Sequence, residues 1–285
     1  MDVLGIDNLS YGLKENIPSG VEFHNQDIRD SRIEKLFVGA DVVFHLAAKN
    51  CISDCQNDPV ETADINVTGT VNVFEAARKA RVRKVIYAES SALYERSGLL
   101  PTPESAVQPE SFYAVSKLAG MHFAEAYKRY FGRTFTALRY FGVYGPIQDY
   151  RRTIPPVMSA FIIKLLKGER PVIYGTGEKR RDFVYVDDVN DFHLLCLRDS
   201  RTDNETYNLG SGENHSVLEI YELVSRLLGV RLEPEFKPDL PGEAQITLAD
   251  ISKALALGWK PKTDLETGLL HAIDYIKFEM AGGRI

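Results

Sequence analysis

The feature that most constrains this chain is the alternation, in its first half, of short β-branched runs with longer amphipathic stretches. The strand-like runs lie at 3–6, 21–23, 42–46, 85–88 and 135–138. Val, Ile and Phe enrich these runs, as expected for buried strands. The patterns over 67–79 and 113–130 predict helices. Strands separated by helices of this length predict an α/β fold with a doubly wound, Rossmann-like parallel sheet.

After the 135–138 run the alternation loosens. Helices are still predicted, at 155–166, 189–197, 216–228 and 265–278. Loops rich in Gly and Pro separate them. We therefore expect a main domain over 1–145 and a smaller lobe mainly over 146–285, with some segments returning to the main domain. The lobe is expected to lie over the carboxyl ends of the strands, where open α/β sheets bind ligands.

Charge and hydropathy limit the partners of the chain. The net charge is −6 with both signs interspersed, which argues against a nucleic-acid surface. The basic run 179–181 is short and flanked by Glu178 and Asp182, so it suits one small anion. No apolar run has the length of a membrane span, and the first residues do not resemble a signal peptide.

The three cysteines, Cys51, Cys55 and Cys196, are an odd set without the spacing of a metal site. Neither a disulfide framework nor a metal is therefore expected. Free thiols are typical of a reducing compartment, so the sequence predicts a cytoplasmic protein.

Tyr113 and Lys117 are four residues apart in a predicted helix, so their side chains share a face. A nearby ammonium favours phenolate and lowers a tyrosine pKa from about 10 toward neutral pH. Such a tyrosine can act as a general base toward a hydroxyl proton. The spacing alone is weak, because a half-buried tyrosine beside a surface lysine gives the same pattern.

Ser90 and Ser91 follow the 85–88 run. A serine at the carboxyl end of a central strand lies where substrate binds in such folds. The Ser90 hydroxyl could then hydrogen-bond the oxygen that Tyr113 deprotonates. The alternative is that the serines cap the turn that follows.

Asp7 ends the first strand-like run, where an acidic residue can accept hydrogen bonds from the adenosine ribose of a dinucleotide and favour NAD over NADP. The alternative is that Asp7 caps its own loop.

Several motifs occur in an order that carries a family resemblance. They are Asp7-Asn8-Leu9-Ser10, Phe44-His45-Leu46-Ala47-Ala48, Asn66-Val67-Thr68-Gly69-Thr70, Ser90, Tyr113 to Lys117, Arg139-Tyr140-Phe141, Arg181-Asp182-Phe183-Val184, Asn208-Leu209-Gly210, Pro241-Gly242-Glu243 and Leu248-Ala249-Asp250. Together they resemble the extended short-chain dehydrogenase/reductases, in the NAD-dependent epimerase/dehydratase family of nucleotide-sugar enzymes. The resemblance covers nearly the whole chain, and an ordered set is more specific than any single motif.

This resemblance implies bound NAD and a catalytic set of Ser90, Tyr113 and Lys117. The implied cofactor-binding residues are Asp7, Asn8, Asp27, Ile28, Leu46, Ala47, Ala48, Asn66, Lys117 and Tyr140. The implied substrate-binding residues are Ser90, Ser91, Arg181 and Thr247. Arg181 is expected in the loop after Gly177, against the substrate diphosphate, although a surface ion pair with Asp182 or Glu178 would also fit.

The residues after Ser90 indicate the reaction. In the family, dehydratases resemble Thr-Asp-Glu at this point and decarboxylases carry a Glu two positions after the hydroxyl residue. Here Ser91 and Ala92 follow, while Glu89 precedes Ser90 and should face the opposite way. The resemblance therefore implies a 4-epimerase acting on UDP-sugars, either UDP-glucose/galactose or their N-acetyl forms. The small Thr247 weakly favours an N-acetyl substrate.

Some positions depart from the family pattern. Gly142 stands where an Asn usually contacts the nucleotide sugar, and Leu240 where an Arg commonly grips the diphosphate. Ile147 stands where an Arg often follows Gly-Pro. These departures keep open a nucleotide-sugar reductase or dehydratase.

The largest departure is the absence of a Gly-x-x-Gly-x-x-Gly turn, which in this fold places a helix N-terminus against the cofactor pyrophosphate. The 3–6 run matches the family's second strand, so one N-terminal βα unit is expected to be missing, through a misplaced start or a truncated gene. Weak NAD binding or a non-catalytic nucleotide-sugar-binding remnant would follow. The resemblance also implies a homodimer built from the helices at 66–81 and 113–130.

Overall fold

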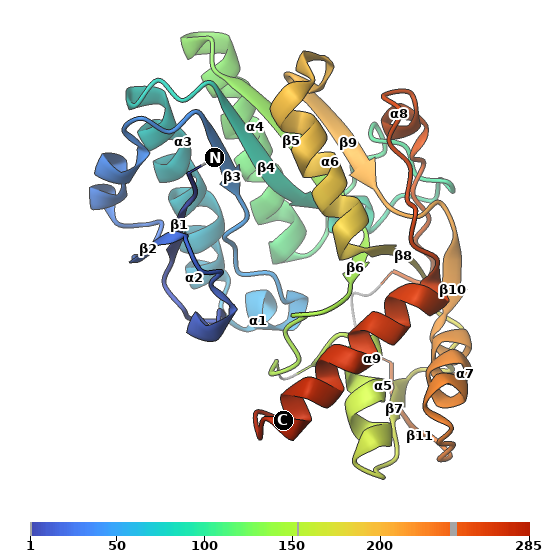
Figure 1. Cartoon of the computed structure of the whole chain (residues 1–285). Helices are drawn as coiled ribbons and strands as arrows, with labels where there is room; N and C mark the ends of the chain where they lie inside the picture. The colour runs from blue at the N-terminus through green and yellow to red at the C-terminus, as the bar shows by residue number, and fades with distance from the viewer. Residues whose placement is uncertain (1, 153, 240–243) are drawn as a thin grey trace. The chain divides into compact units, whose positions relative to one another are not determined.

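The computed structural model describes residues 2–152, 154–239 and 244–285 (Figure 1). The chain forms two compact units. Unit 1 comprises Met1–Ser97, Val107–Arg139 and His193–Tyr207, and unit 2 comprises Gly98–Ala106, Tyr140–Phe192 and Asn208–Ile285. The division into functional domains at residue 145 stays a prediction.

The strands, in chain order, are β1 (Leu4–Asp7), β2 (Glu22–Asn25), β3 (Val42–His45), β4 (Lys84–Ser90), β5 (Thr134–Tyr140), β6 (Gly142–Tyr144), β7 (Val172–Tyr174), β8 (Arg180–Tyr185), β9 (Glu205–Leu209), β10 (Asn214–Ser216) and β11 (Glu235–Lys237). The α-helices are α1 (Ile52–Asn57), α2 (Pro59–Ala63), α3 (Thr70–Lys79), α4 (Phe112–Phe131), α5 (Val157–Leu166), α6 (Val186–Arg198), α7 (Val217–Leu228), α8 (Ser252–Leu255) and α9 (Leu265–Ala281). Short 3-10 turns lie at η1 (Lys14–Asn16), η2 (Ser31–Phe37), η4 (Ser91–Tyr94) and η5 (Ser200–Thr202), and a π-type turn at η3 (Asp64–Gly69).

The predicted strand runs of the first half overlap β1 to β5, which confirms the strand–helix alternation. The helix predicted over 113–130 is α4 to within one residue at each end. The helix predicted over 67–79 begins as the π-type turn η3 before it becomes α3. The later strands, β6 to β11, were not predicted, because pairing with distant segments rather than local sequence stabilises them.

Parallel pairing confirms the predicted fold class. The main sheet has the strand order β3-β4-β5-β9, and β3 pairs parallel with β4. β1 and β2 form a separate parallel pair. Within the described residues, β1 pairs only with β2, and β3 only with β4. The expectation that one N-terminal βα unit is missing stays a prediction.

The core of unit 1 lies between the main sheet and helices α3 and α4 (Figure 1). Phe74, Tyr87 and Tyr127 lie at its centre, with the Phe74 and Tyr127 rings stacked 5.6 Å apart. Gly120 faces Tyr87, and a Cβ at this position would collide with the Tyr87 hydroxyl. This glycine therefore lets α4 approach β4 closely, which fixes the helix that carries Tyr113 and Lys117.

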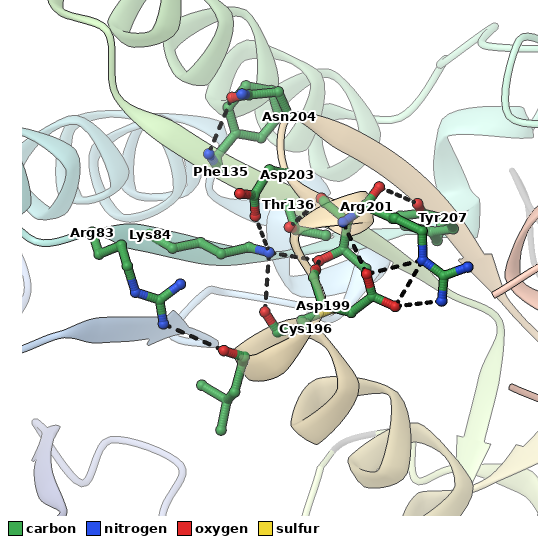
Figure 2. A network of polar contacts seen from close by, with 12 residues as sticks. Arg83, Lys84, Phe135, Thr136, Cys196, Asp199, Arg201, Asp203, Asn204 and Tyr207 are labelled. Carbon is green, nitrogen blue, oxygen red and sulfur yellow. Dashed lines mark hydrogen bonds and ion pairs between the residues drawn. The ribbon is translucent and has the colours of Figure 1, made fainter. Parts of the chain in front are cut away.

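A buried lysine fixes the opposite end of β4, as Figure 2 shows. Lys84 is 1% exposed, and its ammonium donates to Cys196 O (3.0 Å), Thr202 Oγ1 (2.6 Å) and Asp203 Oδ1 (2.6 Å). These three acceptors match the three N–H groups of an ammonium. Thr136 of β5 joins the same network by donating to Thr202 O at 2.6 Å.

Unit 2 contains a sheet of order β10-β8-β6 and a parallel pair of β11 with β7. Helices α5, α7 and α9 contribute to its apolar core. Ser216 and Glu219 cap the start of α7 by reciprocal hydrogen bonds. None of the helices in the described ranges is long and apolar enough to cross a membrane.

Candidate active site

Ser90 is the last residue of β4, at the carboxyl end of a strand inside the main sheet. Its hydroxyl oxygen accepts a hydrogen bond from Ala92 N at 3.2 Å, so Ser90 caps η4 as the alternative interpretation expected. The hydroxyl proton remains available to a substrate oxygen, because a serine hydroxyl accepts and donates at once. Ser91, the next residue, is half-buried. Capping and substrate binding by Ser90 are therefore compatible.

Tyr113 and Lys117 lie in the first turns of α4, which Ser111 caps by accepting from Ala114 N. The carboxylate of Glu95, just after η4, accepts from Ser111 N at 2.7 Å and Ser111 Oγ at 2.7 Å. The turn after Ser90 is thereby tied to the start of the helix that carries Tyr113.

Lys117 is deeply buried rather than at the surface. Its side chain is 3% exposed, and its Nζ lies 4.7 Å from the centre of the Tyr87 ring. Tyr113 is 9% exposed. The alternative of a half-buried tyrosine beside a surface lysine is therefore wrong for the lysine.

Two bases that pack against the Tyr87 ring, Lys117 and His45, have pKa values lowered by burial. Burial lowers the pKa of Lys117 to about 8, an effect that the charge of Glu89 opposes. Burial, assisted by the Lys117 charge, lowers the pKa of His45 to about 3, so this imidazole is neutral at pH 7. His45 Nε2 lies 2.8 Å from Thr70 Oγ1. A lysine with a pKa near 8 can exchange its proton close to working pH.

Glu89, which the sequence placed away from the site, is a buried residue that forms an ion pair next to Ser90. It is 2% exposed, and its Oε2 accepts from Arg139 Nε at 2.7 Å. Burial raises the pKa of Glu89 against the opposing charges of Arg139 and Lys117. The pairing joins residues fifty positions apart, so no local sequence pattern could have revealed it.

The predicted adenosine-binding residues gather at the carboxyl ends of β1 and β2. Asn8 Nδ2 donates to Asp27 Oδ2 at 2.9 Å, and Ile28 lies against Gly69. Asp7 Oδ1 accepts from Leu9 N at 2.6 Å, which is the loop-capping role named as the alternative. The second carboxylate oxygen of Asp7 still adds an acceptor to this exposed edge.

Asn66 organises the loop that follows β3. It is 1% exposed, its Oδ1 accepts from Lys49 N at 2.8 Å, and its Nδ2 donates to Lys49 O at 2.9 Å. The same Nδ2 donates to Ser116 Oγ at 2.9 Å, one residue before Lys117. The loop contains the remaining cofactor candidates, exposed Leu46 and half-buried Ala47 and Ala48. Asn66 therefore has a structural task beside any contact with a cofactor.

The remaining candidates, Tyr140, Arg181 and Thr247, lie in unit 2. Arg181 was expected in a loop, and this is wrong: it lies on β8, opposite His215 of β10. Pairing with β10 and β6 on both sides makes 180–185 a central strand. Arg181 Nη1 donates to Arg180 O at 3.0 Å, and Thr247 Oγ1 accepts from Asp182 N at 3.1 Å.

Two of the departures from the family pattern can be located. A Cβ at Gly142 would lie 2.8 Å from Asp182 O and from Phe183 Cδ1, so the approach of β6 to β8 excludes an Asn here. Ile147 adopts a positive φ of 65° and is 55% exposed. Leu240 and the 241–243 motif lie outside the described residues.

The residues of unit 1 fit a dinucleotide with free ribose hydroxyls. The exposed Asp7 offers a carboxylate acceptor, which suits hydroxyl donors and would repel a 2′-phosphate. The Asp27 carboxylate is already engaged, since it accepts from Arg29 Nε and Nη2 and from Asn8 Nδ2. Lys117 offers a buried cation one helical turn from Tyr113. The sequence has no Gly-x-x-Gly-x-x-Gly turn for a pyrophosphate.

Comparison with known proteins gives consistent matches. A family model described as "NAD dependent epimerase/dehydratase family" matches residues 1–210. A Methanocaldococcus jannaschii protein provisionally named UDP-glucose 4-epimerase is 39% identical over 280 residues, covering 97% of this chain and 90% of that protein.

Solved structures agree with this match. The UDP-glucose 4-epimerase of Thermotoga maritima with UDP-glucose superposes with a TM-score of 0.94 at 34% identity, covering 98% of this chain and 92% of that one. The UDP-N-acetylglucosamine 4-epimerase of Methanobrevibacter ruminantium, in complex with UDP-N-acetylmuramic acid, gives 0.94 at 31% identity, covering 98% and 91%.

Proposed function

The chain belongs to the NAD-dependent epimerase/dehydratase family, and from this premise we propose that it is a UDP-sugar 4-epimerase. The enzyme class and the use of NAD follow from the family, whereas the reaction, the sugar and the residue roles are proposed here. Bound NAD would supply the hydride acceptor for oxidation at the sugar C4 and the hydride donor for reduction of the same carbon from its opposite face.

The observation that carries the proposal is the chemistry around Ser90. Tyr113 and Lys117 lie one helical turn apart on α4, whose start is tied to the turn after Ser90. Ser91 and Ala92 supply no carboxylate, and Glu89 is held by Arg139. Elimination of water needs an additional acid and base, whereas epimerisation needs one group that takes and returns a proton.

In the proposed mechanism Tyr113 acts as the base in its phenolate form. The C4 hydroxyl donates its proton to the Tyr113 oxygen as the C–H bond breaks, and Ser90 donates a hydrogen bond to the oxygen that becomes a carbonyl. The Lys117 ammonium stabilises the phenolate. After the 4-keto sugar has rotated to present its opposite face, Tyr113 returns the proton to the same oxygen.

The proposed cofactor residues divide by chemistry. Asp7 would accept from the adenosine ribose, with Asp27 and Ile28 near the adenine, and Asn8 is a further proposed contact at this edge. Lys117 would hold the nicotinamide ribose, and Asn66 would fix the loop with Leu46, Ala47 and Ala48 beside the cofactor. Tyr140 is a further proposed contact. Arg181 is proposed for the substrate diphosphate, because a guanidinium forms charge-assisted pairs with phosphate oxygens. Ser91 and Thr247 are proposed as further substrate contacts.

We test the reaction by incubating the chain with saturating NAD and each of UDP-glucose and UDP-N-acetylglucosamine, and by following the sugar C4 proton by NMR. The proposal expects the C4 epimer and no net NADH. A 4-keto-6-deoxy product, or net NADH consumption with a keto-sugar, would instead select the dehydratase or reductase of the same family. Binding of a UDP-sugar without NAD would identify a non-catalytic remnant.

We also propose a homodimer built from the helices at 66–81 and 113–130, and the support for it comes from α4. The exposed apolar residues of this helix, Phe112, Val115, Phe123 and Tyr130, recur at helical spacing on one face, and Tyr130 is 75% exposed. A monomeric protein rarely leaves such a stripe open. Sedimentation should give a dimer for the parent chain and a monomer for Phe123→Asp. Cytoplasmic location stays a prediction that rests on the cysteines.

A further inference from the structure

The buried carboxylate of Glu89 carries an inference that goes beyond the reaction itself. Glu89 and Tyr87 lie two residues apart on β4, so their side chains leave the same face of the strand, and Ser90 leaves the other. Glu89 has one oxygen, Oε2, bonded to Arg139, while its Oε1 is buried without a hydrogen-bond partner among the described residues. Such an acceptor costs free energy unless its charge serves a purpose.

Arg139 connects Glu89 to the far end of the turn that begins at Ser90. Its Nη1 donates to Tyr94 Oη at 2.9 Å, and its guanidinium carbon lies 5.3 Å from the centre of the Tyr94 ring. Tyr94 is the last residue of η4. Arg139 thus joins Glu89, the residue before Ser90, to Tyr94 at the end of the turn that follows Ser90.

The face of β4 that carries Glu89 also meets the buried lysine. Lys117 Nζ lies over the Tyr87 ring, and Tyr87 Oη donates to Lys117 O at 3.2 Å. The ionisable groups that face Lys117 are Glu89 from β4, Cys55 from α1 and His45 from β3.

The environment of Glu89 itself is mostly cationic. The charged or titratable groups that face Glu89 include Arg139 from β5, Lys117 and His122 from α4, and Tyr87 from β4 itself. Among the described residues that face Lys117, Glu89 is the one carboxylate, while neutral His45 and the thiol of Cys55 carry no charge at neutral pH.

We propose that Glu89 is a positioning residue for proton transfer, which anchors the Ser90 turn through Arg139 and supplies the negative charge that keeps buried Lys117 an ammonium ion. The inference rests on the proposed function, because it assigns Glu89 to the same proton-transfer site. The role requires an ionised carboxylate. Burial raises the pKa of Glu89, and the charges of Arg139 and Lys117 oppose that rise and favour the ionised form.

The decisive measurement is the titration of Lys117 in the chain carrying 13C-labelled lysine, without substrate, with the Lys117 signal assigned by its loss in Lys117→Met. In Glu89→Gln, which keeps the shape but removes the charge, we expect the Lys117 pKa to fall by about one unit. Glu89→Asp, which keeps the charge, should stay near the parent value. Glu110→Gln removes a Glu–Arg pair at the surface and should change nothing.

An unchanged Lys117 pKa in Glu89→Gln would overturn the proposal. If that variant does not fold, Glu89→Ser provides a second neutral residue with room for water beside Arg139, and it is expected to lower the pKa in the same way. In the active enzyme, loss of activity at high pH should begin about one pH unit lower in the neutral variant. Because the lysine titration needs no substrate, its failure is distinguishable from failure of the epimerase proposal.

Discussion

Two regions of unit 1 differ in how deeply their residues are buried. Around the end of β4, Glu89 and Lys117 are 2% and 3% exposed, and hydrogen bonds connect this strand end to α4. In the β1–β2 pair, Leu4 of β1 is 38% exposed and Val3, just before this strand, is 50% exposed; each strand has four residues. The first region is a packed part of the core, and the second is an exposed two-stranded sheet, an element that is marginal by itself.

This difference places the groups proposed for proton transfer in the packed region and those proposed for adenosine binding in the exposed one. The groups that would move protons are held by the fold itself, so they need no ligand to take their positions. The groups that would hold the adenosine lie at an open edge, where ligand contacts would add order. Substitutions in the packed region should therefore change rate or global stability, and substitutions in the open region should change NAD affinity.

The largest expected effect is on the rate. Tyr113→Phe removes the hydroxyl that exchanges the proton, and kcat/KM should fall by about a thousandfold or more. NAD affinity, measured by calorimetry, should change little, because the phenol is assigned to the sugar. A variant that keeps more than a tenth of the parent activity would remove Tyr113 from the mechanism.

The second largest effect is expected on the free energy of unfolding, which substitutions in the two regions should lower by different amounts. Lys84→Met leaves the Asp203 carboxylate and the Cys196 carbonyl without their cation and should lower the free energy of unfolding by about 3 kcal/mol. Ile6→Ala in half-buried β1 should cost about 1 kcal/mol. Urea unfolding measures both, and equal losses would contradict the distinction between the regions.

Buried neutral His45 gives the packed region a pH dependence. Its folded pKa of about 3 lies below the unfolded value of 6.5, so above pH 6.5 the imidazole is neutral in both states and the full stability is present. As pH falls from 6.5 toward 3 only the unfolded state gains the proton, and stability is lost. At pH 5 this loss is about 2 kcal/mol. The urea midpoint of His45→Gln should fall less between pH 8 and pH 5 than that of the parent chain.

The smallest effect is expected at the open edge. Asp7→Asn keeps the cap of Leu9 N through its amide oxygen but removes a carboxylate acceptor from the proposed ribose site. NAD affinity should fall about fivefold, with the free energy of unfolding unchanged. A matched change, Asp41→Asn, removes a surface partner of Arg83 and should leave NAD affinity unchanged. Equal NAD affinity in both variants would remove Asp7 from the cofactor site.

How far the sequence predicted this protein depends on the range of the interactions. β4 and α4 follow from local periodicity, so the positions of Ser90, Tyr113 and Lys117 could be predicted. β8 forms only by pairing with β6 and β10, so Arg181 was expected in a loop. The pair of Glu89 with Arg139 and the burial of Lys117 depend on tertiary packing.

The role of a glycine can also depend on distant residues that the local sequence does not reveal. Gly142 could be read from sequence only as a lost substrate contact, whereas the structure explains it by the close approach of β6 to β8. The absence of a glycine-rich turn was visible in the sequence, but the separate pairing of β1 with β2 could not be read from the residues alone.

The central claim is that the sugar C4 is oxidised and reduced again on one face and then the other, with Tyr113 exchanging only the hydroxyl proton. It is tested most directly with UDP-glucose carrying deuterium at C4, incubated with the chain and saturating NAD in ordinary water. The UDP-galactose formed should retain the deuterium at C4. Product in which solvent hydrogen has replaced the deuterium would contradict it.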